Sequence, residues 1–135
     1  MVPLVVDASL LVEYLIRSDI GKEFSGILED PDVRLHAPAL CDLEVASTLR
    51  CLLLRRETTL ERAGEALSDL LDLPLVRHGH ESLLRRVISL RKNFSAYDAS
   101  YVALAELLRA PILTTDHSLA RAVKVHTDVP LLIAD

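Results

Sequence analysis

Tryptophan is absent from this chain of 135 residues, and aromatic residues make up only 4% of it. A hydrophobic core must therefore be built mainly from Leu, Val, Ile and Ala, and half of the residues are hydrophobic. Glycine is rare and no low-complexity run occurs, which argues against a disordered chain. No apolar run approaches the roughly 20 residues of a membrane span, and no basic segment typical of a signal peptide precedes Val2. We therefore expect a cytoplasmic protein, not bound to membrane, with a single domain over residues 1–135.

Cysteine is also scarce, since Cys41 and Cys51 are the only two and show no CxxC spacing. This pattern is typical of two buried, reduced thiols rather than of a disulfide or a zinc site. Acidic residues outnumber basic ones, 20 to 15, so the chain has a net charge of −5. Such a chain is not expected to bind nucleic acid by broad electrostatic attraction, although its acids are suited to holding cations.

Short apolar runs alternate with segments of helical periodicity. Strands are predicted at residues 4–6, 75–76 and 112–115, with weaker candidates at 33–37 and 131–133. Helices are predicted over residues 10–15, 40–53, 60–71, 81–92 and 96–108. Thr58 and Glu61 have the spacing of a capping box at the start of the third helix. Because strands separated by helices need crossover connections, we predict a three-layer α/β/α domain with a small, mostly parallel sheet.

Four acids stand where a predicted strand ends or a predicted helix begins: Asp7, Glu44, Asp98 and Asp116. Sites in open α/β sheets form beyond the carboxyl ends of the strands, so we expect these acids to meet at one mouth of the sheet. Two unit charges about 4 Å apart repel by roughly 4 kcal/mol at an effective dielectric constant near 20. Such a cluster calls for a cation, and hard oxygen ligands suit Mg²⁺ or Mn²⁺. A site of this kind is matched to phosphodiester hydrolysis.

Each acid also has a structural interpretation, because acids at helix starts cap free N–H groups and favour the helix dipole. Ser95 and Asp98 have the spacing of a capping box. Asp116 is placed to cap a short helix through Leu119, and Asp7 to cap the first helix, with Ser9 as a competitor. Capping by itself does not require acids, since Ser or Asn serves equally well.

The segments "VVDASLLVEYL", "APALCDLEVASTLR", "SAYDASYVALAE" and "ILTTD" resemble the successive motifs of PIN-domain ribonucleases, and within that family the VapC-type toxins of toxin–antitoxin pairs. The resemblance covers almost the entire chain, in the expected order and spacing. It implies that Asp7, Glu44 and Asp98 are metal ligands and that Asp116 is a fourth, direct or through water. It further implies a PIN-like α/β/α fold and Mg²⁺- or Mn²⁺-dependent endonucleolytic cleavage of RNA.

The same resemblance assigns supporting roles to hydroxyl residues near the acids. Ser9, Thr114 and Thr115 are expected to orient ligands or waters. Ser47 stands where many relatives have Asn, which predicts an altered site rather than an inactive one. The family also implies a tRNA or ribosomal RNA substrate, a homodimer, and a cognate antitoxin whose tail reaches the acidic site.

Other polar residues are open to more than one interpretation. Asp42 lies two positions before Glu44, roughly 200° around the helix, so both acids are not expected to face one metal. The pairs Arg91–Lys92 and Arg55–Arg56 are placed near helix ends, where cations are favourable, and the first pair is our candidate for binding RNA phosphates.

Three histidines near these segments are given no role in catalysis. His78 and His80 are expected in a loop, and His117, which follows Asp116, is not required as a general base.

Two other functions remain open from the residues alone. A response-regulator receiver also has a parallel sheet and acids that bind Mg²⁺. It requires an acidic pair after the first strand and a Lys after the last, and neither accompanies Asp7 or residues 131–133. A non-catalytic PIN-like binding domain is disfavoured by the presence of all four acids.

Overall fold

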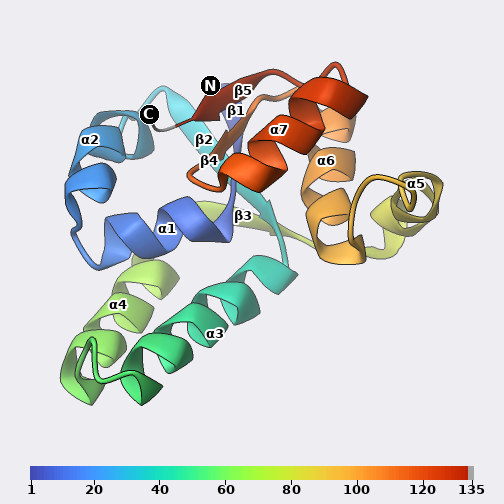
Figure 1. Ribbon diagram of the computed structural model, residues 1–135. Coiled ribbons are helices and arrows are strands. Elements are labelled where there is room, and N and C mark those ends of the chain that lie inside the picture. Colours follow the sequence, from blue (N-terminus) through green and yellow to red (C-terminus); the bar gives the residue numbers. More distant parts are fainter. Residues whose placement is uncertain (134–135) are drawn as a thin grey trace.

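A computed structural model of the chain describes residues 1–133, with only the backbone described at residue 133. Five strands form one sheet (Figure 1), and every neighbouring pair is parallel. The strands are β1 (Val2–Val6), β2 (Val33–Pro38), β3 (Leu75–His78), β4 (Ile112–Thr114) and β5 (Leu131–Ile133). Their order across the sheet is β3-β2-β1-β4-β5. The predicted α/β class and small parallel sheet are confirmed, while the prediction of one domain over residues 1–135 stays a prediction.

The central strands are short apolar runs because helices cover both of their faces. Val5 and Val6 in β1 and Ile112 and Leu113 in β4 are fully buried. Such continuous burial is typical of parallel strands and explains why these runs do not alternate with polar residues. All five predicted strands exist, although β3 continues to His78.

Helices pack on both faces of the sheet, so the three-layer prediction is confirmed. On one side α1 contacts α2, α3 and α4, and on the other side α6 packs on the central strands with α5 and α7 beside it (Figure 1). The helices are α1 (Ala8–Leu15), α2 (Asp19–Leu28), α3 (Leu40–Leu54), α4 (Leu60–Asp72), α5 (Leu84–Ser89), α6 (Ala96–Leu108) and α7 (His117–His126), with a 3₁₀ turn, η1, at Glu81–Leu83. Every residue of α6 from Ala99 to Ala105 is buried, as expected for the helix that lies over the middle of the sheet.

One helix was not predicted. Helix α2 contains Gly21 and Gly26, and glycine lowers helix propensity by about 1 kcal/mol relative to Ala. Ser18 starts this helix, because its hydroxyl accepts the Gly21 N–H at 3.0 Å. A Cβ atom added at Gly21 would lie only 2.1 Å from the Glu13 carbonyl oxygen. Glycine is therefore needed there for α2 to lie against α1.

Three smaller predictions were wrong. The helix expected over residues 81–92 is a 3₁₀ turn followed by α5, which ends at Ser89, and the next residue, Leu90, is buried. The third helix is capped not by Thr58 but by Thr59, whose hydroxyl accepts the Arg62 N–H at 3.2 Å. Cys51 is exposed on α3, whereas Cys41 is buried as predicted.

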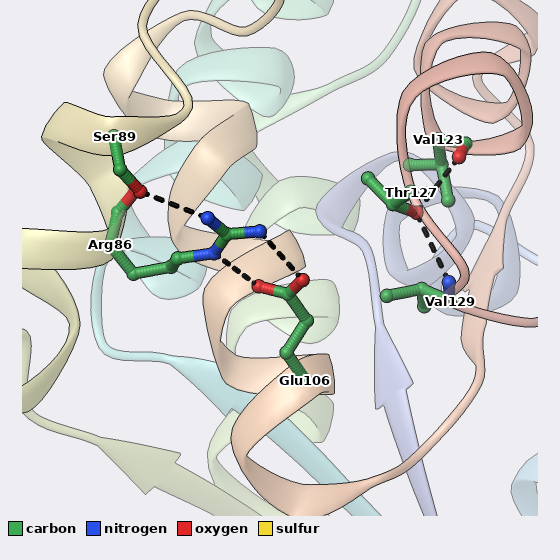
Figure 2. A network of polar contacts seen from close by, with 6 residues as sticks. All are labelled: Arg86, Ser89, Glu106, Val123, Thr127 and Val129. Carbon is green, nitrogen blue, oxygen red and sulfur yellow. Dashed lines mark hydrogen bonds and ion pairs between the residues drawn. The ribbon is translucent and has the colours of Figure 1, made fainter.

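Polar side chains join the later elements of the fold (Figure 2). The Arg86 guanidinium on α5 donates from Nε and Nη2 to the two Glu106 carboxylate oxygens on α6, at 2.7 and 3.0 Å. Thr127 ends α7 by donating to the Val123 carbonyl, and its hydroxyl also accepts the Val129 N–H. Both partners of the ion pair are partly exposed, so the pair orients α5 on α6 more than it stabilises the fold.

The topology fixes where a site can form. The chain passes outward from β1 to β2 and β3, then returns across β1 to β4 and β5. The direction reverses between β1 and β4, and the crevice beyond the carboxyl ends of these two strands is the usual ligand site of an open parallel sheet. Among the described helices, none combines the length and the apolar character needed to span a membrane.

Candidate active site

Asp7 directly follows β1 and occupies the N-cap position of α1, yet its side chain makes no capping hydrogen bond. Instead, its Oδ2 accepts hydrogen bonds from Ser9 Oγ at 2.6 Å and Thr114 Oγ1 at 2.8 Å. Asp7 is only 7% exposed. Burial raises the pKa of this carboxyl, the two hydroxyl donors oppose that rise, and the Asp116 charge adds to it. The capping interpretation of Asp7 was therefore wrong.

Asp116 follows β4 and is placed by Thr114, the last residue of that strand. The Thr114 hydroxyl accepts the Asp116 N–H at 2.9 Å while it donates to Asp7. One oxygen of Asp116, Oδ1, accepts the Leu119 N–H at 3.1 Å and so caps α7, as predicted. The cap uses one carboxylate oxygen and leaves the other without a protein donor among the described residues.

Glu44 lies in the first turns of α3 and is about half-buried. Its Oε1 accepts a hydrogen bond of 2.6 Å from the Tyr101 hydroxyl on α6. Burial raises the pKa of Glu44, the Tyr101 hydrogen bond lowers it, and the charges of Asp7 and Asp98 raise it further.

Asp98 lies in the first turn of α6 and is partly buried. The Ser95 hydroxyl caps this helix by accepting the Asp98 N–H at 3.1 Å. Within residues 1–133, the Asp98 carboxylate itself accepts no hydrogen bond, so capping does not use its charge. Burial raises its pKa, and the charges of Asp7 and Asp116 raise it further.

Charges of neighbouring acids raise the pKa of three of the four acids, which are Asp7, Glu44 and Asp98. Asp7 raises the pKa of both Glu44 and Asp98, and Asp116 raises that of Asp7 and Asp98. No Lys or Arg contributes to these shifts in the described part of the chain, so the negative charges are not neutralised by the protein. Over the same residues, no three acidic, His or Cys side chains are already gathered tightly enough to enclose an ion.

The donor chemistry of this cluster fits a hard divalent cation. The four acids follow β1 and β4 or lie in the first turns of α3 and α6, and no Lys or Arg among the described residues contributes to the pKa shifts of Asp7, Glu44 and Asp98. Cys41 does not compete as a ligand, because burial raises the pKa of its thiol to about 12. A small cation such as Mg²⁺ takes one or two carboxylates and keeps waters, so it does not need a preformed cage of protein ligands.

Comparison with known proteins identifies the family of this site. Residues 4–125 match the PIN domain, and this match spans all four acids. The chain belongs to the PIN-domain family. Its relatives include ribonuclease VapC3 of Mycobacterium tuberculosis, with 40% identity over 87% of this chain and 85% of the relative. Ribonuclease VapC1 of the same species is 37% identical over 95% of this chain and 96% of the relative.

A third relative, the VapC ribonuclease Mb0985 of Mycobacterium bovis, is 37% identical over 84% of this chain and 85% of its own length. These relatives confirm the family and enzyme class predicted from the motifs, which is the VapC ribonucleases. Because the relatives are ribonucleases, the alternative interpretation of the chain as a response-regulator receiver is wrong. A crystal structure of PAE2754 from Pyrobaculum aerophilum has a TM-score of 0.66 at 20% identity, over 96% of this chain and 83% of that one, and supports the PIN-domain fold.

The remaining predicted site residues of this PIN domain differ in how closely they approach the acids. Ser9 and Thr114 hold Asp7, as described above. Thr115 contributes its backbone N–H to Ser9 Oγ at 3.4 Å, while its hydroxyl makes no hydrogen bond within the described residues. Ser47 is exposed and is likewise absent from this hydrogen-bond network. Arg91 and Lys92 are exposed in the segment that leads into α6.

Asp42 faces a different partner, as its helical position predicts. Its Oδ2 accepts from Arg77 Nε on β3 at 2.7 Å. Arg77 also donates to the carbonyls of Leu70 and Leu75, so this acid serves to join α3, α4 and β3.

Two residues that hold the site in place were missed by the motif analysis. In the sequence, Tyr101 has the pattern of an ordinary core residue. The only sign that it lies near the candidate site is its position one helical turn after Asp98. His80 was expected in a loop without a role, but its Nε2 accepts the Leu40 N–H at 3.1 Å and caps α3. Ala39, at the N-cap position, has no side chain for that purpose. His78 ends β3, and its Nε2 lies 2.8 Å from Nδ1 of His36.

Proposed function

We propose that this chain is an endoribonuclease that hydrolyses RNA phosphodiester bonds with Mg²⁺ or Mn²⁺ held by Asp7, Glu44, Asp98 and Asp116. The observation that supports the proposal is that Thr114 links Asp7 to Asp116, and that neighbouring acids raise the pKa of Asp7, Glu44 and Asp98 with no Lys or Arg among the causes in the described residues. A divalent ion held by these four carboxylates would neutralise charge on the scissile phosphate and make a bound water more acidic.

The chain's own residues prepare this chemistry by fixing carboxylate oxygens before RNA arrives. The hydroxyls of Ser9 and Thr114 donate hydrogen bonds to Oδ2 of Asp7, and the Leu119 N–H donates to Oδ1 of Asp116. These contacts fix the orientation of both carboxylates. In the net reaction, a water oxygen forms a new bond to phosphorus, the bond from phosphorus to the leaving oxygen breaks, and a proton passes to that oxygen or to solvent.

The test uses purified protein and a mixture of structured RNAs. We expect cleavage with Mg²⁺ or Mn²⁺, none with EDTA, and a loss of at least about 100-fold in Asp7→Asn and Asp98→Asn, since such ligands act on the reacting phosphate. Asp72→Asn is the matched control, because Asp72 is exposed on α4. Cleavage by the Asn variants at the wild-type rate would contradict the assignment of these acids, and absence of cleavage by the wild type would favour a non-catalytic binding domain.

RNA contact is assigned to Arg91 and Lys92, which lie just before the helix that carries Asp98. Local positive charge is needed because the chain as a whole carries −5. Reversal of both charges is expected to weaken RNA binding and to reduce the slope of log K against log salt by roughly 1.5. Reversal of Arg55 and Arg56 at the end of α3 is the control, and an unchanged slope in the first variant would remove these residues from the RNA surface.

The partners follow from the family and from exposed apolar side chains. We propose that the protein is a cytoplasmic homodimer, that it is silenced by a cognate antitoxin, and that its substrate is a tRNA or ribosomal RNA. Exposed leucines on α3 and α4 offer apolar surface for such partners, namely Leu43, Leu54, Leu60 and Leu71. The mass in solution by light scattering tests the dimer, and sequencing of RNA ends after expression in cells tests the substrate.

A further inference from the structure

The Tyr101 side chain is fully buried, yet it carries a polar hydroxyl into the core. It is the largest of the fully buried side chains, and its neighbours in α6 are almost all small or aliphatic. Burying a hydroxyl costs free energy unless it is hydrogen-bonded, and Phe would fill the same space without that cost. The hydroxyl therefore calls for an explanation beyond packing.

Among the described residues, that hydroxyl has one carboxylate partner. It donates to Glu44 Oε1 at 2.6 Å, across the interface between α6 and α3. Tyr101 thus links α6 to α3 at Glu44 itself.

The contact acts on one oxygen of Glu44 and leaves the other available. Glu has three rotatable side-chain bonds, and fixing them costs conformational entropy whenever a ligand must be positioned. A short hydrogen bond to Oε1 fixes these bonds in the protein itself. Asp98 lies one turn before Tyr101 on α6, so the same helix that holds Glu44 in place also carries a second acid of the site.

We propose that Tyr101 is a positioning residue that orients the Glu44 carboxylate for the divalent ion, an inference that rests on the proposed function. Tyr101 does not touch the ion or the RNA. Partners that orient ligands in this way typically contribute about 10- to 100-fold to metal affinity. A residue that only tied α6 to α3 would affect unfolding and leave ion binding unchanged.

The first test measures Mn²⁺ affinity by the EPR signal of free Mn²⁺. Tyr101→Phe is expected to bind Mn²⁺ about 10- to 100-fold more weakly than wild type. Tyr97→Phe is the matched control, since Tyr97 lies one turn earlier on the same helix and is 66% exposed. Wild-type affinity in Tyr101→Phe would overturn the inference.

A double-mutant cycle tests whether Tyr101 acts through Glu44. Glu44→Gln is expected to weaken Mn²⁺ binding, and adding Tyr101→Phe to that variant should weaken it no further. Losses that simply add would show that Tyr101 acts independently of Glu44 and would overturn the inference. Loss of Mn²⁺ binding in Asp7→Asn, together with wild-type binding in Tyr101→Phe, would leave the proposed function standing and remove this inference alone.

A measurement on the unaltered protein avoids any dependence on a variant that folds poorly. The chain has three tyrosines, so ¹³C labelling at the tyrosine ring carbon bonded to the hydroxyl gives three signals. Addition of Mg²⁺ should shift the Tyr101 signal, because its hydrogen-bond acceptor becomes a ligand, while the signal of Tyr97 stays in place. An unmoved Tyr101 signal at saturating Mg²⁺ would also overturn the inference, and absence of any Mg²⁺ or Mn²⁺ binding would overturn it together with the proposed function.

Discussion

The hydroxyl of Thr114 donates to Asp7 Oδ2 at 2.8 Å and accepts the backbone N–H of Asp116 at 2.9 Å. One fully buried side chain therefore links the first of the four candidate ligand acids to the last of them. Thr114 lies in β4, which pairs with β1, so the contact depends on the correct order of the strands.

The first prediction concerns this hydroxyl. Thr114→Val keeps the shape of the side chain but leaves the Asp116 N–H without its acceptor and Asp7 without one donor. We expect the free energy of unfolding to fall by about 1–3 kcal/mol and RNA cleavage to fall as well. Thr115→Val is the control, since its hydroxyl makes no hydrogen bond in the described part of the chain. Equal stability of the two variants in urea unfolding would contradict the role given to Thr114.

The second prediction concerns how much the four acids destabilise the folded protein when no divalent ion is bound. Burial and the Asp116 charge raise the pKa of Asp7, so the ionised form is disfavoured in the folded state at neutral pH. In EDTA at pH 7, Asp7→Asn is expected to unfold at a higher temperature than wild type. A gain of about 1 kcal/mol corresponds to roughly 4 °C for a domain of this size.

Addition of Mg²⁺ should reverse the order of these two proteins. The ion binds the folded wild type and stabilises it by mass action, whereas Asp7→Asn should gain little. Thermal unfolding followed by circular dichroism, with Asp72→Asn as the control, checks both parts. An Asp7→Asn protein less stable than wild type in EDTA would show that the carboxylate is favourable in the fold.

The third prediction tests the close approach of α2 to α1. Gly21→Ala places a methyl group 2.1 Å from the Glu13 carbonyl oxygen. This oxygen is a backbone atom, so it cannot move away without distorting helix α1. We expect a loss of about 1–3 kcal/mol in the free energy of unfolding, or more. Gly26→Ala in the same helix meets nothing within 4 Å and should be neutral or stabilising by up to about 1 kcal/mol. Denaturant unfolding of the pair separates packing from helix propensity.

The fourth prediction concerns acid sensitivity at the β2–β3 edge. Burial lowers the pKa of His36, and the neighbouring His78 and Arg34 lower it further. The unfolded chain therefore takes up a proton more readily than the folded one, so the His36 contribution is fully present above about pH 6.5 and is lost as the pH falls through the folded-state pKa. The His36–His78 hydrogen bond weakens in the same range, because it needs one unprotonated nitrogen.

His36→Gln should therefore show a shallower decline of unfolding free energy between pH 7 and pH 5 than wild type. His117→Gln is the control, since His117 is exposed on α7. Identical pH profiles for wild type and His36→Gln would exclude His36 as the source of the acid sensitivity.

Strongly patterned segments made most of the fold predictable from sequence. The apolar runs of β1 and β4 and helix α6 were recognised because their burial leaves few polar positions, and α3 was recognised because its apolar residues recur at helical spacing. Helix α2 was missed because its two glycines hide the helical pattern, and its stability comes from contact with α1 rather than from propensity. The local pattern of apolar and polar residues in the sequence does not reveal such tertiary contacts.

The candidate site, like the fold, could be predicted only in part from the sequence. The four acids and Ser9 stand in recognisable motifs, whereas the Glu44–Tyr101 contact joins residues on separate helices and has no local signature. The His80 cap of α3 is hidden for the same reason, because the capping residue comes from beyond β3. Ser47, chosen from its place in the motif, is exposed, which shows that motif position alone does not establish contact.

The order of the strands also has a consequence during synthesis. Strand β4 lies beside β1 in the middle of the sheet, but the ribosome makes it near the end of the chain. A nascent polypeptide carries Asp7, Glu44 and Asp98 well before Thr114 and Asp116 exist to complete the crevice. Because this pairing of distant segments cannot form until β4 has been made, a partly synthesised chain lacks the Thr114 hydroxyl that holds Asp7 and joins it to Asp116.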